Sequence, residues 1–431
     1  MAKKRLFVLS ADAMVTEDVE YLKTLPNYKK YLAGGSMVKR VRTIYPTITY
    51  PCHTSMATGT YPNKHGLYSN LEFHAGELKL PWAWFHDRVK VPDIFTAAKK
   101  IGLTTAAVFW PVTGNHPDID YLIAEYWTQS KDDTLREAFK RAGSNEEVLK
   151  IVDRHAPIMV ERQHPMCDEF IVKCACDMIR EFKPDLLMIH PANIDGYRHQ
   201  TGLFNDKIKQ GIEETDRWIG EMMEAAKEAG IADEVNFVLT SDHGQLDIKR
   251  IMNPNVIFAE HGLIQVGEDN KIVNWDAYCL SGGLSAMVYL KDPNNKEIYQ
   301  KVYTLLQEMK EEGIYGISQV FTETEINELE HLGGDFSFVL ESDDYTSFGD
   351  SWQRPLVSNF DLSDYRYGRA THGHLPDKGP QPIFVVKGPG FKEGVEIDRR
   401  PIVDEAPTYA KLLGTELPDA DGIAIDEILA E

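Results

Sequence analysis

The chain has 431 residues, of which 43% are hydrophobic and 26% charged, which suits one large globular domain or a core with an inserted second domain. Its formal net charge of −21 disfavours nucleic-acid polymers and anionic membranes as partners, so we expect a small-molecule substrate. No apolar run approaches the length of a membrane span, and Leu6–Leu9 is too short for the apolar core of a secretory signal.

Strand-like apolar runs alternate with helical patterns along most of the chain. A strand over Arg5–Leu9 precedes a polar helix near Asp18–Leu32, and a helix at Asp93–Lys100 precedes a strand at Thr104–Phe109. The pattern continues with helix Cys167–Phe182, strand Asp185–His190, amphipathic helix Asn205–Ala229, and strands Val235–Thr240 and Pro382–Lys387. This alternation predicts an α/β fold, a doubly wound and mostly parallel sheet that binds ligands at the carboxyl ends of its strands.

The stretch 253–367 has a different character. It contains a β-like run at Leu284–Leu290, a helix at Asn295–Glu312 and a further run at Phe336–Leu340 among acidic turns. It also separates two parts of the candidate site described below. We therefore predict a metal-binding catalytic core formed by 1–252 and 368–431, with 253–367 inserted as a smaller α+β cap domain.

The five cysteines indicate a reducing environment, because their number is odd and they are thinly spread. We expect free thiols and a cytoplasmic protein. Cys174 and Cys176 could form a soft metal pair. Neighbours two apart diverge on a helix, however, so packing in the core is the favoured interpretation.

Carboxylate and imidazole side chains follow two of the predicted strands. Asp12 follows the first strand, although an aspartate there could simply cap the next helix. Asp242 and His243 follow the strand at Val235–Thr240, and Gly244 allows a bend that brings both side chains to one ion. Such side chains are the ligands that zinc and similar ions prefer.

Two further segments carry the same chemistry. If the chain after Asp185–His190 turns helical, Asp195 and His199 share one face, one turn apart. The alternative is a capping aspartate with an exposed histidine. His372 lies in a turn-rich stretch with His374, and a pair of exposed loop histidines is its alternative. Because independent segments repeat the pattern, we predict that their side chains converge on one site.

Thr49 precedes a short helical run that ends near Gly59. A hydroxyl at a helix N-terminus would meet free N–H groups that suit an anionic phosphoryl group. Thr49 fits an ordinary N-cap equally well, and the two interpretations are compatible. Asn70 carries an amide that could donate to a phosphoryl oxygen, or it could be a turn residue. Phe109 and Trp110 could form an aromatic platform for a base, although core packing is the favoured interpretation for either one alone.

These segments resemble the alkaline phosphatase superfamily and, more narrowly, its nucleotide pyrophosphatase/phosphodiesterase (type I phosphodiesterase) branch. The resemblance covers nearly the whole chain and implies an alkaline phosphatase-like core. It is carried, in chain order, by Asp12, Pro46–His53, Tyr61–Gly66, Phe109–Pro111, Asp195, His199, Asp242–Gly244 and His372–Gly373.

The resemblance also implies roles for individual residues. Thr49 would be the nucleophile, and Asn70 would bind a nonbridging phosphoryl oxygen. Two ions about 4 Å apart would clamp the attacking and leaving oxygens of an in-line displacement. The implied ligands are Asp195, His199 and His372 for one zinc ion, and Asp12, Asp242, His243 and the Thr49 oxygen for the other.

The implied activity is metal-dependent hydrolysis of small phosphodiesters or nucleotide pyrophosphates through a phospho-threonine intermediate. Zinc is favoured by the histidines, and manganese fits the carboxylates. Two other hydrolytic activities stay open on the same site. One is a phosphonoacetate-type C–P hydrolase, for which Lys64 and Lys131 could bind a substrate carboxylate, and the other is a phosphomonoesterase. A metal-stabilised nucleotide-binding protein without turnover is the non-enzymatic alternative.

Overall fold

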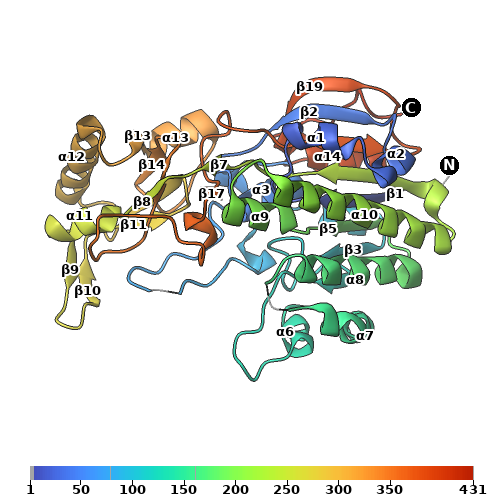
Figure 1. Ribbon diagram of the computed structural model, residues 1–431, viewed down its shortest axis with the longest axis horizontal. Coiled ribbons are helices and arrows are strands. Elements are labelled where there is room, and N and C mark those ends of the chain that lie inside the picture. Colours follow the sequence, from blue (N-terminus) through green and yellow to red (C-terminus); the bar gives the residue numbers. More distant parts are fainter. Residues whose placement is uncertain (1–3, 78, 161, 431) are drawn as a thin grey trace.

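A large, mostly parallel sheet forms the centre of the molecule (Figure 1). The computed structural model describes residues 4–77, 79–160 and 162–430. The sheet has eight strands in the order β19-β2-β18-β6-β1-β5-β3-β4, and β18 runs antiparallel to both of its neighbours. The strands span, in that order, Glu396–Pro401, Ser36–Arg42, Phe384–Lys387, Val235–Thr240, Arg5–Ser10, Leu186–Ile189, Thr105–Val108 and Tyr121–Ile123. The predicted α/β fold is confirmed.

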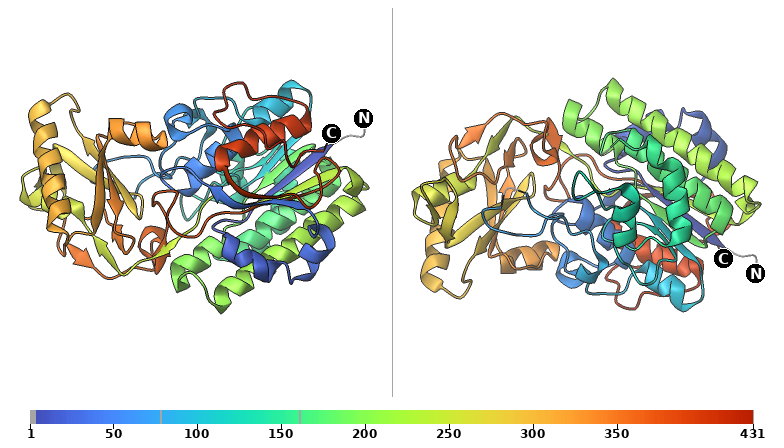
Figure 2. Two further views of the ribbon diagram at one scale, coloured as in Figure 1. Left: turned by 90° about the horizontal axis from the view of Figure 1, so that it is seen from above. Right: turned by 90° about the horizontal axis from the view of Figure 1, so that it is seen from below.

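Helices cover both faces of this sheet, as the two views of Figure 2 show. Successive side chains of a strand point to opposite faces, and alternate residues of β1 accordingly join two separate hydrophobic clusters. The central strands β6, β1, β5 and β3 are therefore buried on both sides, which explains their largely apolar sequences. One cluster contains α8 (Met166–Phe182) and α10 (Asp206–Glu228), and the other contains α3 (Thr49–Thr58), α5 (Ile94–Lys100) and α14 (Glu405–Leu413).

The single helix predicted near Asp18–Leu32 is wrong. The structure has two short helices there, α1 (Val19–Leu22) and α2 (Pro26–Tyr31), separated by a turn. Pro26 lacks an N–H group and clashes with the preceding turn of a continuous helix, so a new helix begins at this residue. The helices α5 and α10, in contrast, begin where predicted, because Asp93 and Asn205 cap them with their side chains.

A second, smaller group of elements lies beside the large sheet, at the left of Figure 1. Its centre is an antiparallel four-stranded sheet in the order β11-β12-β14-β13, packed against α12 (Lys296–Glu312). These strands span Ala277–Ser281, Ser285–Leu290, Phe338–Ser342 and Ile317–Thr322, and α13 (Glu323–Glu330) follows β13. The boundaries of the inserted domain at 252/253 and 367/368 stay a prediction.

Shorter elements complete the chain. No helix among the described residues is both long enough and apolar enough to cross a membrane. The remaining α-helices are α4 (Pro62–His65), α6 (Leu135–Arg141), α7 (Glu146–His155), α9 (Asn193–Thr201) and α11 (Pro254–Glu260). The remaining strands are β7 (Leu246–Asp247), β8 (Arg250–Met252), β9 (Ile264–Val266), β10 (Ile272–Trp275), β15 (Thr346–Phe348), β16 (Val357–Ser358) and β17 (Ala370–Thr371).

Candidate active site

Three adjacent strands position most of the predicted site. Strands β5, β1 and β6 are parallel, so their carboxyl ends meet at one edge of the sheet. Asp12 follows β1, and Asp242 and His243 follow β6. Strand β5 leads into α9, on which Asp195 and His199 lie one turn apart. Directly after β17, a short strand paired with β7, the chain reaches His372.

The first cluster consists of Asp195, His199 and His372, whose possible ligand atoms all lie within 4.8 Å of one another. Nδ1 of His199 lies 2.7 Å from the carbonyl oxygen of Ala370 and therefore carries the ring proton. Nε2 lies 3.1 Å from Oδ2 of Asp195, and no described residue donates a hydrogen bond to that nitrogen. The charge of Asp195 raises the pKa of His199, so Nε2 binds a proton when no metal ion takes its place. Two acceptors that face each other at this distance leave a place for a cation.

The second cluster consists of Asp12, Asp242 and His243, again within 4.8 Å of one another. Nε2 of His243 lies 3.2 Å from Oδ2 of Asp242 and 3.6 Å from Oδ1 of Asp12. Both of these carboxylate oxygens are buried and lack a hydrogen-bond partner among the described residues. Burial, together with the charge of Asp195, raises the pKa of Asp12 well above its ordinary value, and burial together with Asp12 does the same for Asp242.

Both clusters fit a divalent ion in donor chemistry and spacing. At zinc–ligand distances of about 2.0–2.2 Å, the donor atoms of a tetrahedral site lie about 3.3–3.6 Å apart. The separations of 3.1, 3.2 and 3.6 Å are close to that range. The clusters are neighbours, since the rings of His243 and His372 stack with centroids 4.1 Å apart. Metal binding by these residues stays a prediction.

Thr49 is the first residue of α3 and lies beside the second cluster. Ile48 is the N-cap, so the alternative that Thr49 is an ordinary capping residue is wrong. The Thr49 hydroxyl lies 3.2 Å from Nε2 of His243, and the side chain is largely buried. The hydroxyl therefore combines the free N–H groups of a helix N-terminus with the proximity of the acidic and imidazole groups.

Asn70 is held in place by the backbone that follows Thr49. Its Oδ1 accepts a hydrogen bond of 2.8 Å from the N–H of Tyr50, which leaves the amide nitrogen free to donate. That nitrogen lies 3.4 Å from the hydroxyl of Tyr365, a residue that the sequence did not bring to notice. The orientation of the amide agrees with the role implied by the resemblance.

Phe109 and Trp110 lie in the hydrophobic core. Their exposed fractions are 2% and 1%, and they belong to the two clusters on opposite faces of the large sheet. Trp110 packs edge-on against His53, with ring centroids 4.8 Å apart. Neither ring offers an open face to a substrate base, so the structure corrects the expectation of an aromatic platform in favour of core packing.

Two histidines behind the site were missed by the sequence reasoning. Nε2 of His190 lies 3.2 Å from Oδ2 of Asp12. His53 lies one turn after Thr49 on α3, where one ring nitrogen contacts the Thr49 carbonyl oxygen at 2.9 Å and the other contacts Ser10 at 2.9 Å. Burial lowers the pKa of His53 well below its ordinary value, so its ring is neutral. His190 could have been identified from its position alone, because it directly follows β5, whose carboxyl end lies at the site.

A third cluster of possible metal ligands, His86, Asp93 and His116, lies among the described residues. Nε2 of His116 lies 2.9 Å from Oδ2 of Asp93, while its Nδ1 accepts a hydrogen bond of 3.0 Å from the N–H of Asp118. Nδ1 is therefore unprotonated and Nε2 carries the proton, which it donates to Asp93. A metal ion at Nε2 would require the opposite tautomer, so we interpret this cluster as an ordinary hydrogen-bonded group.

Gly373 is required next to His372. Its φ of +101° favours glycine, and a Cβ atom would lie 2.0 Å from the carbonyl oxygen of Gly282. We expect Gly373→Ala to lower the free energy of unfolding by about 3 kcal/mol, measured by urea denaturation. Gly394→Ala is the matched control, since Gly394 has a φ of +71° with open space around it. Equal losses in the two variants would contradict the importance of the close approach.

The family of the chain follows from comparison with known proteins. The family model described as type I phosphodiesterase / nucleotide pyrophosphatase matches residues 6–344. The chain therefore belongs to the type I phosphodiesterase / nucleotide pyrophosphatase family.

Individual relatives are distant. The venom phosphodiesterase CdcPDE of Crotalus durissus collilineatus is 25% identical over 230 residues, which are 52% of this chain and 24% of the relative. Human ectonucleotide pyrophosphatase/phosphodiesterase family member 1 is 24% identical over 234 residues, which are 52% of this chain and 22% of the relative. The matches thus span about a quarter of the length of these relatives.

Solved structures show the same fold over the whole chain. Murine ectonucleotide pyrophosphatase / phosphodiesterase 5 superposes with a TM-score of 0.68 at 17% sequence identity, covering 99% of this chain and 100% of that one. An inactive variant of that murine protein in complex with AMP gives the same values. This likeness confirms the architecture that was predicted for the core.

Proposed function

We propose that the protein is a metal-dependent hydrolase of small phosphodiesters or nucleotide pyrophosphates, with Thr49 as its nucleophile. The observation that carries the proposal is the Thr49 hydroxyl, 3.2 Å from His243, at a helix N-terminus beside two buried carboxylate–imidazole clusters. Family membership supports the reaction class. Buried acceptors without partners destabilise a fold, so their convergence on the Thr49 hydroxyl indicates a functional site rather than ordinary core packing.

The residues divide the reaction into two displacements. When bound, two divalent ions would supply positive charge that favours the ionised hydroxyl and the departing oxygen; zinc is favoured and manganese is compatible with the donors. Oγ of Thr49 attacks phosphorus, and the bond to the leaving-group oxygen breaks as the phospho-threonine ester forms. Water then attacks phosphorus, which frees the threonine hydroxyl and the product. Asn70 donates to a nonbridging phosphoryl oxygen throughout.

Nucleotide-like diesters are the substrate class that we favour. The acidic chain, with a net charge of −21, suits small substrates rather than polymers. A murine protein with the same fold has been described in complex with AMP, which supports a nucleotide as part of the substrate. The five cysteines are buried and free, which supports the proposed cytoplasmic location.

The C–P hydrolase alternative has little support from the placement of Lys64. Its Nζ lies 3.0 Å from Oδ1 of Asp421 and also contacts the carbonyl oxygen of Asp419, so this lysine is engaged outside the site. No described contact of Lys131 points to the site either. The C–P hydrolase alternative is therefore tested only by including phosphonoacetate among the compounds below.

The test is turnover by the metal-supplemented protein on four compounds: bis-p-nitrophenyl phosphate, p-nitrophenyl phosphate, the p-nitrophenyl ester of thymidine monophosphate, and phosphonoacetate. We expect the two diesters to be hydrolysed with kcat/KM at least about tenfold above the other two. A preference for phosphonoacetate or for the monoester would replace the proposal by the corresponding alternative. No turnover of any compound would leave the non-enzymatic alternative.

A further inference from the structure

We propose that Tyr365 is a substrate-contacting residue of this site, whose hydroxyl binds a phosphoryl oxygen together with Asn70, and that Arg366 positions it. The inference rests on the proposed function and extends its site to the chain segment between β16 and β17. No sequence motif marks this segment. The evidence comes from three sets of contacts.

Tyr365 lies against the first cluster of the site. Its ring is nearly parallel to that of His372, with an interplanar angle of 20° and centroids 5.7 Å apart. The centroids of the His199 and Trp82 rings are also 5.7 Å from that of Tyr365. The side chain is half-buried, so part of it stays open to a ligand that reaches the site.

The hydroxyl of Tyr365 meets the amide of Asn70. The Asn70 nitrogen donates to this hydroxyl over 3.4 Å, a long contact, and no described residue accepts the proton of the hydroxyl itself. The Asn70 amide and the Tyr365 hydroxyl are therefore neighbours, and each keeps a donor that no described contact uses. Both could donate to one anionic phosphoryl oxygen, which is a stronger acceptor than the Tyr365 hydroxyl. An ordinary tyrosine hydroxyl carries its proton at neutral pH and can therefore donate to such an oxygen.

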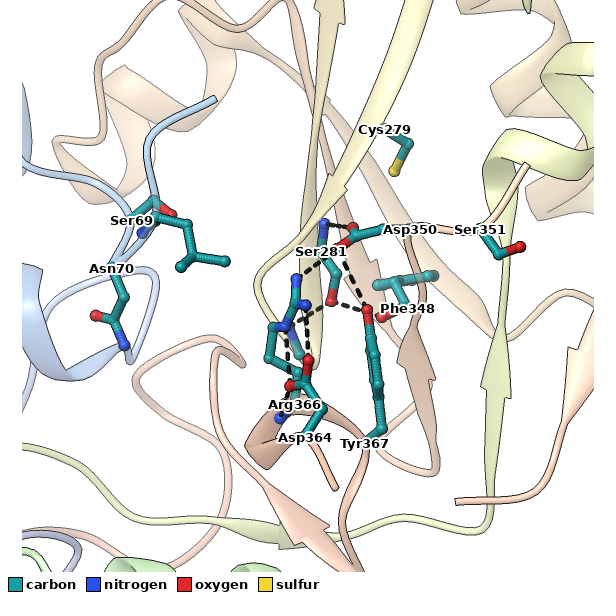
Figure 3. A network of polar contacts seen from close by, with 12 residues as sticks. Ser69, Asn70, Cys279, Ser281, Phe348, Asp350, Ser351, Asp364, Arg366 and Tyr367 are labelled. Atoms are coloured by element: carbon teal, nitrogen blue, oxygen red, sulfur yellow. Dashed lines mark hydrogen bonds and ion pairs between the residues drawn. The ribbon is translucent and has the colours of Figure 1, made fainter. Parts of the chain in front are cut away.

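A partly buried ionic network fixes the backbone on either side of Tyr365 (Figure 3). The guanidinium of Arg366 donates to both carboxylate oxygens of Asp364, at 3.1 and 2.8 Å, and also binds Asp350. Asp350 in turn accepts hydrogen bonds from the backbone N–H of Ser281 at 2.6 Å and from the hydroxyl of Tyr367 at 3.3 Å. The network therefore ties residues 364–367 to β11 and to the loop after β15.

The network sets the direction of Tyr365. Figure 3 shows Arg366 and Tyr367 turned toward Asp350, on the side away from Asn70. Only 12% of the Arg366 side chain is exposed, and a guanidinium buried to this degree is stable only while its ionic partners stay in place. The side chains of Arg366 and Tyr367 are directed to Asp350 by these contacts. The Tyr365 side chain instead contacts Asn70 and the first cluster. Arg366 is thus a positioning residue for Tyr365.

The test compares Tyr365→Phe with Tyr367→Phe in the metal-loaded protein. Both changes remove one tyrosine hydroxyl from the same turn, but only the first removes one that faces the site. We expect Tyr365→Phe to lower kcat/KM for bis-p-nitrophenyl phosphate by about 10- to 100-fold, and to weaken binding of inorganic phosphate by about tenfold or more. Tyr367→Phe removes only the long 3.3 Å contact with Asp350 and leaves the contacts of Arg366 with Asp364 and Asp350 in place. It should therefore change neither quantity by more than about threefold.

Arg366 is tested through its coupling to Tyr365. Arg366→Met should lower kcat/KM on its own, yet cause little further loss in a Tyr365→Phe background, because the hydroxyl that it positions is then absent. Arg366→Lys, which keeps the charge, should recover part of the loss. Additive losses would show that Arg366 acts independently of Tyr365 and would overturn its positioning role.

The outcomes separate this inference from the proposed function. If Tyr365→Phe and Tyr367→Phe are indistinguishable in both turnover and phosphate binding, the inference fails while the proposed function stands. If the wild-type protein hydrolyses none of the compounds, the proposed function fails. Calorimetric titration with inorganic phosphate still decides the contact in that case, since weaker binding by Tyr365→Phe alone supports it and unchanged binding overturns it.

Discussion

Replacing Thr49 by alanine is expected to lower phosphodiester hydrolysis by at least about 10³-fold, because the variant has no oxygen with which to attack phosphorus. The hydroxyl is the one side-chain oxygen on α3 that contacts a residue of the two clusters among the described hydrogen bonds. Initial rates on bis-p-nitrophenyl phosphate at saturating metal measure the effect. Thr49→Ser should retain much more activity than Thr49→Ala, since it keeps the nucleophilic oxygen.

Thr54→Ala is a matched control for this prediction. Thr54 lies on the same helix, is similarly buried, and donates its hydroxyl to the backbone of Tyr50 at 2.8 Å rather than to the site. The control should keep activity within about threefold of the wild type once folding is confirmed. A Thr49→Ala variant with more than a tenth of the wild-type rate would rule out Thr49 as the nucleophile.

Removal of metal is expected to have the largest effect on stability. Each bound ion contributes about 4 kcal/mol to the free energy of unfolding when the free ion concentration is about 1,000 times its Kd for the native state. Chelation should remove this contribution and leave the buried carboxylates of Asp12 and Asp242 without a cation. Urea denaturation with and without chelator at pH 8 measures the loss. An unfolding midpoint that does not respond to the chelator would contradict metal binding.

The free energy of unfolding that is lost on chelation should also depend on pH. The pKa values of Asp12 and Asp242 are raised without metal, so the folded state binds more protons than the unfolded state in the window above about pH 4. These two groups therefore make metal-free protein lose stability as pH rises toward their raised pKa values. Above about pH 7, His243 and His372, whose pKa values are lowered, are largely neutral in both states and do not offset this loss. Metal-loaded protein should lose less, because its ligands are already deprotonated.

The core of the fold and the convergence of the candidate ligands could be predicted because they depend on local patterns, whereas the division of these ligands into two clusters was implied by the family resemblance. Alternation of apolar strands with capped helices marks a parallel sheet, and such a sheet gathers the residues at its carboxyl ends. Asp12, Asp242 and His243 follow their strands directly, so strand order alone brings them together. The helical spacing of Asp195 and His199 has the same local character.

Other parts of the site depend on tertiary contacts that leave no local pattern. Tyr365 reaches Asn70 through a turn held by ionic contacts, and Gln245 reaches the carboxylate of Asp195 through its amide. The burial of Phe109 and Trp110 likewise depends on which helices cover each face of the sheet. Sequence spacing cannot distinguish an aromatic ring that lines a site from one that packs beneath it.

The most direct test of the two-step reaction is to trap the covalent intermediate. Metal-loaded protein would be mixed with a nucleotide-type diester, quenched with acid during turnover, digested and analysed by peptide mass spectrometry. The proposed reaction predicts a phosphoryl or nucleotidyl adduct on Thr49 that is absent from the Thr49→Ala variant. Turnover by the wild type without any adduct, or with the adduct on another residue, would contradict a threonine nucleophile at this site.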